Sequence, residues 1–92
     1  MDKKGYINVM EEVITVFVNI LMSGPEYQTF CHCSKCKLDV IALSLNNIPP
    51  QYVTNEERRH DVLERYNQPE MRTWINKRII QAMHVVNKFP KH

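Results

Sequence analysis

The chain has 92 residues, a formal net charge of +2 and 43% hydrophobic residues. This length predicts one domain, residues 1–92, and the charge is too small to indicate nucleic-acid binding. No stretch approaches the roughly 18 apolar residues that indicate a membrane span. Glu11 and Glu12 interrupt the apolar segment after the basic start, so no signal peptide is expected. The odd cysteine count then fits a reducing cytoplasm.

The first predicted helix covers roughly residues 6–23 and ends before Gly24 and Pro25. Its polar residues recur at three- and four-residue spacing, and apolar residues cover most of the remaining surface. Such a helix has to be covered on two sides, and a small chain offers little material to do so. The segment therefore predicts a symmetric homodimer. The expected interface residues are Val9, Val13, Phe17 and Ile20.

All three cysteines lie in one short motif, C-x-C-x2-C, formed by Cys31, Cys33 and Cys36. Thiols so close in sequence can reach one metal ion without long-range folding, and thiolates favour zinc among the common divalent ions. Ser34 is expected to be the N-cap of the next helix. Cys36 would then lie in the first turn, where the helix dipole lowers a thiol pKa. The motif predicts a zinc site.

A closed structural zinc site needs four ligands, and the motif supplies three. The fourth could be His32, His60, a carboxylate, a group from a partner chain or water, and the sequence does not choose among them. Two other interpretations remain open. The cysteines could form a disulfide with one spare thiol, or stay reduced without a metal.

The second predicted helix covers roughly residues 35–47 and ends before Pro49 and Pro50. Its expected ion pair joins Lys35 to Asp39, one turn later. Its expected core face consists of Leu38, Ile41, Ala42 and Leu45.

Two more helices are predicted, over roughly residues 55–66 and 69–88. Thr54 and Glu57 form a capping box for the first of them, and Pro69 suits the first turn of the second. The core stripe of the last helix consists of Met71, Trp74, Ile75, Ile79, Ala82, Met83 and Val86. No segment has a convincing strand pattern, so the predicted fold is all-α, a small four-helix domain.

Residues 8–12, the cysteine motif and residues 37–53 together resemble the late competence development protein family, ComFB. The resemblance implies a small helical bacterial protein of the cytoplasm that forms a homodimer. It also implies zinc held by cysteines, here Cys31, Cys33 and Cys36. The family's zinc is held by four cysteines, and this chain departs from that pattern. Some ComFB-like proteins are described as cyclic di-GMP receptors.

The chain has no Gly-rich phosphate loop, no nucleophile elbow and no paired-carboxylate pocket, so we expect a regulatory or adaptor protein and not an enzyme. Any small ligand should be anionic, because Lys35 and Lys37 lie at a predicted helix N-terminus. Arg58 and Arg59 would add forked donors to that site, with Tyr52 available to stack on a base. The alternative is a nucleic-acid-binding accessory protein of DNA uptake.

Overall fold

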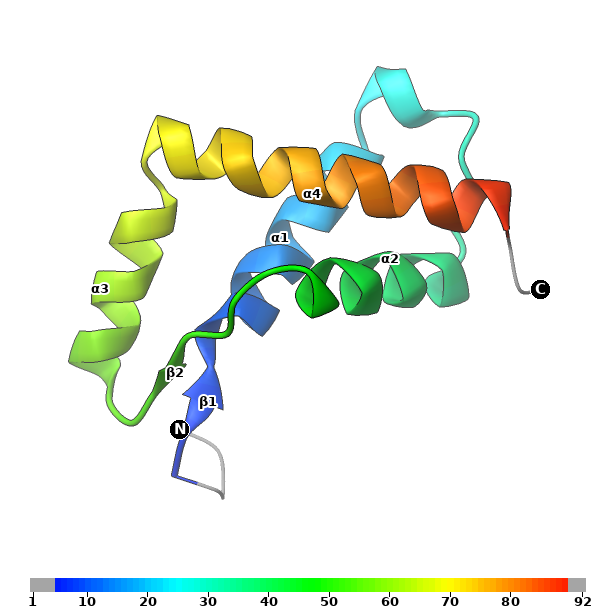
Figure 1. Cartoon of the computed structure of the whole chain (residues 1–92). Helices are drawn as coiled ribbons and strands as arrows, with labels where there is room; N and C mark the ends of the chain where they lie inside the picture. Colours follow the sequence, from blue (N-terminus) through cyan, green and yellow to red (C-terminus); the bar gives the residue numbers. More distant parts are fainter. Residues whose placement is uncertain (1–4, 90–92) are drawn as a thin grey trace.

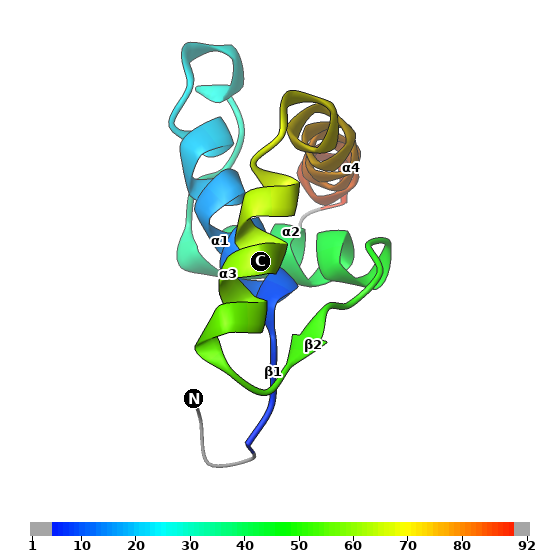
Figure 2. The ribbon, with the colours of Figure 1, turned by 90° about the vertical axis from the view of Figure 1, so that its left-hand side faces the viewer.

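A computed structural model describes residues 5–89 as four helices and one short antiparallel ribbon (Figure 1). Helices α2 and α4 run side by side, α1 crosses them, and α3 lies at one end of the molecule, as the turned view in Figure 2 also shows. The elements are β1 (Ile7–Asn8), α1 (Val9–Met22), the 3-10 helix η1 (Pro25–Tyr27), α2 (Ser34–Asn46), β2 (Tyr52–Val53), α3 (Glu56–Tyr66) and α4 (Pro69–Lys88).

One hydrophobic core joins all four helices. Its most deeply buried large side chains include Met10 and Ile14 from α1, and Ile75, Ile79 and Met83 from α4. Helix α4 begins and ends where the sequence predicted, and its predicted apolar stripe faces this core. Pro69 fixes the start, because its missing N–H is at a position that needs no intrahelical partner.

The four predicted helices are confirmed, and the ribbon β1–β2 corrects only the expectation that no segment forms a strand. Ile7 pairs with Val53 and Asn8 with Tyr52. Asn8 also caps α1: its Oδ1 accepts hydrogen bonds from Met10 N at 3.1 Å and from Gln51 N at 2.9 Å. Strands of two residues are too short to give a period-two pattern, so the sequence could not reveal them.

The predicted capping box at Thr54 is wrong. The N-cap of α3 is Asn55, whose Oδ1 accepts a hydrogen bond from Arg58 N at 2.9 Å. Thr54 and Asn55 are both good N-cap residues, and the adjacent ribbon places the first helical residue at Glu56.

The predicted core face of α2 is right for Ile41 and Leu45, which are half-buried and pack against the core, and wrong for Leu38 and Ala42. The buried residues of this helix are Cys36, Val40 and Ser44, at four-residue spacing, whereas Leu38 is 64% exposed. Ala42 is exposed as well. The helix carries apolar residues on more than one side, so periodicity could not identify the side that α1 and α4 cover.

Helix α1 is covered by its own chain more fully than expected. Val9 and Val13 are 0% and 6% exposed and belong to the core, although Val13 also lines the open groove between α1 and α3. Phe17 is half-buried and Ile20 is 63% exposed. The homodimer and its interface residues therefore stay predictions.

None of the helices within residues 5–89 combines the length and the apolar character that crossing a membrane requires.

Candidate metal centre

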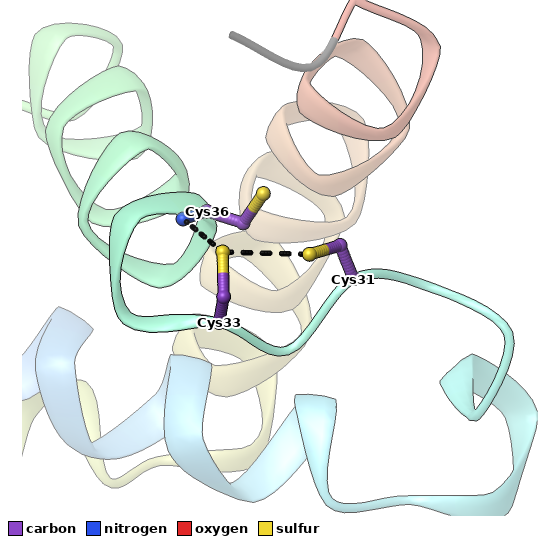
Figure 3. Close-up of side chains that lie close together, drawn as sticks. All are labelled: Cys31, Cys33 and Cys36. Carbon is purple, nitrogen blue, oxygen red and sulfur yellow. Dashed lines mark hydrogen bonds between the residues drawn. The ribbon is translucent and has the colours of Figure 1, made fainter. Parts of the chain in front are cut away.

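The three cysteines meet where the loop after α1 enters α2 (Figure 3). Their sulfur atoms all lie within 4.8 Å of one another, and Cys31 Sγ is 3.4 Å from Cys33 Sγ. Phe30 precedes the motif, and its ring makes edge contacts with the rings of Tyr27 and His84. These contacts hold the loop against η1 and α4 and bring Cys31 close to the start of α2.

Cys33, not Ser34, is the N-cap of α2. Its backbone is extended, with φ −68° and ψ 159°, and its Sγ accepts a hydrogen bond from Cys36 N at 3.4 Å. Ser34 is already the first helical residue. The sulfur thus takes the position that a serine or aspartate oxygen usually occupies at a helix start.

The two cysteines flanking this helix start have opposite pKa shifts. Burial raises the pKa of Cys36 to about 12, with smaller contributions from Cys31 and Cys33. The hydrogen bond from the Cys36 backbone N–H lowers the pKa of Cys33, and the Cys31 thiol lowers it further. The expectation of a lowered pKa at Cys36 is therefore wrong, because its loss of solvent outweighs its place in the first turn.

The arrangement of the sulfurs fits a bound zinc ion. Tetrahedral zinc with Zn–S bonds of about 2.3 Å holds its sulfurs about 3.8 Å apart. The three thiols already lie within 4.8 Å of one another, so small side-chain rotations would bring them onto one ion.

Neither histidine considered as a fourth ligand joins the cluster. His32 Nε2 lies 2.8 Å from the carbonyl oxygen of Tyr27. His60 lies on α3 and pairs with Glu64 at 3.1 Å, and α3 is at the other end of the molecule (Figure 1). Within residues 5–89, Cys31, Cys33 and Cys36 are the only group of three or more possible metal ligands.

The predicted four-residue anion site does not form. Lys35 and Lys37 lie at the start of α2, whereas Arg58 and Arg59 lie on α3 at the opposite end of the molecule (Figures 1 and 2). Lys35 pairs with Asp39 at 3.9 Å, as expected. Arg59 is held by ion pairs with Glu12 and Glu56, which raise the pKa of its guanidinium.

Arg58 instead lines a groove of about 340 Å³ between the ribbon and α3. The other polar or aromatic residues of this groove include Arg65, Asp61 and Tyr52. Tyr52 is 62% exposed, and its ring makes an edge contact with the ring of Tyr6 at a centroid distance of 5.8 Å. The spacing of residues 58, 61 and 65 along one helix face was the sequence signal for this groove, but its other wall, the ribbon, was not visible.

Comparison with known proteins identifies the family. The sequence profile of the late competence development protein ComFB matches residues 7–90. The chain belongs to the ComFB family. The solved structure of the late competence protein ComFB from Bacillus subtilis is similar, with 26% sequence identity and a TM-score of 0.80. That match covers 94% of this chain and 92% of the B. subtilis ComFB chain. No curated protein sequence matched.

Proposed function

We propose that this ComFB family member is a zinc-stabilised, non-enzymatic regulatory or adaptor protein that works as a homodimer in the cytoplasm. The observation that carries the proposal is the convergence of three thiols at the start of α2. Zinc bound there would tie the loop carrying Cys31 to the helix carrying Cys36. Because such a site does not exist in the unfolded chain, the free energy of metal binding would add to the free energy of folding.

Elemental analysis of the purified protein tests the metal. We expect one zinc per chain, and a melting temperature that falls when a chelator removes it. Cys36→Ser should lower zinc content and stability together. Ser34→Ala is the matched control, because Ser34 is exposed, adjacent in the chain and not a predicted ligand. Absence of metal together with a disulfide between two of the cysteines would overturn the proposal.

The groove between the ribbon and α3 is a better candidate for an anion-binding site than the start of α2. Arg58 and Arg65 would offer two guanidinium groups to phosphates, and the exposed Tyr52 ring would offer a face for a base. The Asp61 carboxylate would accept hydrogen bonds from base N–H groups. This combination suits a nucleotide with two phosphates and supports cyclic di-GMP as the ligand.

Calorimetry with cyclic di-GMP tests this part of the proposal. Binding should be lost in an Arg58→Ala/Arg65→Ala double variant and kept in a Lys77→Ala variant, whose side chain is exposed on α4. No heat change at millimolar nucleotide would remove the dinucleotide and leave a protein partner as the better candidate. Salt-sensitive binding to short DNA in place of the nucleotide would favour the accessory role in DNA uptake.

A further inference from the structure

Two of the three cysteines enclose the first turn of α2. Cys33 is the N-cap of this helix and Cys36 is its third residue, with Ser34 and Lys35 between them. Reactive cysteines occur at helix N-termini and in C-x-x-C motifs, and this pair combines the two features. The pair therefore has the spacing and the position of a redox pair as well as those of metal ligands.

The backbone already holds Cys33 and Cys36 at the separation that a disulfide requires. The Cα atoms of bridged cysteines lie about 4.4–6.8 Å apart. Ser34 and Lys35 are both helical, and a helical turn places Cα atoms three positions apart at about 5 Å. The two sulfur atoms lie within 4.8 Å of each other (Figure 3), so rotation of the side chains is enough to close the bond.

The helix also favours this pair over the other close pair. Cys31 Sγ lies 3.4 Å from Cys33 Sγ, but only His32 separates these two residues, and its loop backbone would have to bend to close so small a ring. Cys36 N donates a hydrogen bond to Cys33 Sγ at 3.4 Å, so the Cys33 sulfur lies against the turn that carries Cys36.

Solvent reaches the two sulfur atoms of the pair unequally. Cys33 is exposed, whereas Cys36 is only 2% exposed. The space beside Cys36 measures about 10 Å³, and even one water molecule needs roughly 10–15 Å³. A disulfide from solution can therefore meet Cys33 but not Cys36. The hydrogen bond from Cys36 N and the helix N-terminus stabilise negative charge on the Cys33 sulfur, as a nucleophile requires.

We propose that Cys33 and Cys36 form a reversible disulfide with a small disulfide as the oxidant, and that this reaction releases zinc. The inference rests on the zinc binding proposed above. The Cys33 thiolate attacks one sulfur of R–S–S–R, which forms a mixed disulfide and releases one R–S⁻. The Cys36 thiolate then attacks the Cys33 sulfur and releases the second R–S⁻. The cysteine pair loses two electrons, the small disulfide gains them, and both released thiolates take protons from the buffer.

Zinc leaves because it loses two of the thiolates that hold it, and the thiolate is the form of cysteine that binds a metal. The loop carrying Cys31 then loses its link to α2, together with the folding free energy that the metal supplied. Reduction would restore both thiolates and allow zinc to bind again. The proposed regulatory protein would thus respond to the thiol–disulfide balance around it.

Glutathione disulfide provides the test, with full-length protein that has been reduced, loaded with zinc and freed of reductant. We expect one zinc released for each disulfide formed, and full recovery of the zinc after reduction and addition of fresh metal. Trypsin cleavage after Lys35 identifies the bond, because it leaves Cys31 and Cys33 on one peptide and Cys36 on another. A bond from Cys33 to Cys36 joins the two peptides, and fragment ions show which cysteine carries the link.

Two matched double variants test the order of attack. Cys31→Ser/Cys36→Ser should accumulate one glutathione on Cys33, whereas Cys31→Ser/Cys33→Ser should leave the buried Cys36 unmodified. Circular dichroism checks that each variant is folded. Where one is not, the mapping of the wild-type protein decides.

A disulfide that involves Cys31 would overturn the inference. So would zinc that stays bound, with all three cysteines reduced, in excess glutathione disulfide, or equal labelling of the two folded double variants. Reduced protein that takes up no zinc before any disulfide is added would instead overturn the proposed zinc function.

Discussion

Ser44 carries a buried polar group with no hydrogen-bond partner. Its side chain is fully buried between α2 and the core, and its Oγ is the only such atom among the described residues. A buried hydroxyl without a partner costs about 1–3 kcal/mol of folding free energy. The residue thus reduces stability at a position that an apolar side chain of similar size would fill.

We predict that Ser44→Ala raises the free energy of unfolding by about 1 kcal/mol, because it removes the unpaired hydroxyl and only one heavy atom of packing. Urea unfolding measures the effect. Ser23→Ala is the control, because the Ser23 hydroxyl is exposed and donates to the carbonyl of Asn19; it should not stabilise the protein. A loss of stability in Ser44→Ala would show that the hydroxyl has a partner in solution.

Metal binding should depend on pH through Cys36. Its pKa of about 12 means that the thiol is protonated at neutral pH, so zinc has to displace that proton. We predict that the apparent zinc affinity rises by at least about tenfold per pH unit between pH 6.5 and 7.5, one factor of ten for each proton released. Competition with a chelator of known protonation behaviour measures this slope. An affinity that does not change with pH would exclude Cys36 as a ligand.

At the scale of the element, the start of α1 depends on one side chain. Asn8 Oδ1 accepts hydrogen bonds from α1 and from the segment before β2, and Val9 N donates to Gln51 O at 2.9 Å. The residue therefore joins the first helix to a segment 43 positions later in the chain.

We predict that Asn8→Ala lowers the free energy of unfolding by about 2 kcal/mol, because it loses a helix cap and a second, partly buried hydrogen bond. Asn8→Asp keeps an acceptor oxygen at the same place and should retain most of the stability. Urea unfolding of the two variants provides the comparison. Equal stability of the alanine and aspartate variants would contradict this role of the Asn8 oxygen.

The sequence predicted an element well where one local feature was enough to define it. Pro69 and one apolar stripe defined α4, and the cysteine spacing identified the group that the structure brings together. Prediction of the N-caps failed because Cys33 and Asn55 each lie next to another residue that can cap a helix. Prediction of the buried face failed in α2, which is apolar on two sides. The separation of Lys35 from Arg58 depends on how the helices are arranged, which local patterns do not encode.

At the scale of the whole molecule, an apolar surface remains between α1 and α3. Val16 lines an open groove of about 500 Å³ together with Phe17 and Leu63, and Ile20 is exposed one turn after Val16 on the same helix. Exposed apolar side chains gathered in this way are typical of an interaction surface. This surface is where the predicted homodimer interface would lie.

We predict that Ile20→Asp converts a dimer to a folded monomer, because it places a charge in an apolar contact without disturbing the core. Native mass spectrometry and sedimentation at micromolar concentration measure the change. Thr15→Asp is the matched control, because Thr15 is exposed on the polar side of the same helix. A wild-type protein that is already monomeric, or an Ile20→Asp variant that stays dimeric, would contradict the prediction.

The position of the last turn of α4 matters for the choice of an affinity tag. Asn87 borders the same small space as Cys31 and Cys36, so the last turn of α4 lies beside the sulfur atoms. A polyhistidine tag fused after this helix would add imidazoles that compete with the three cysteines for a bound metal ion. Strand β1, by contrast, lies toward the end of the molecule that carries α3 (Figure 1). Metal stoichiometry and coordination should therefore be compared between N-terminally and C-terminally tagged proteins.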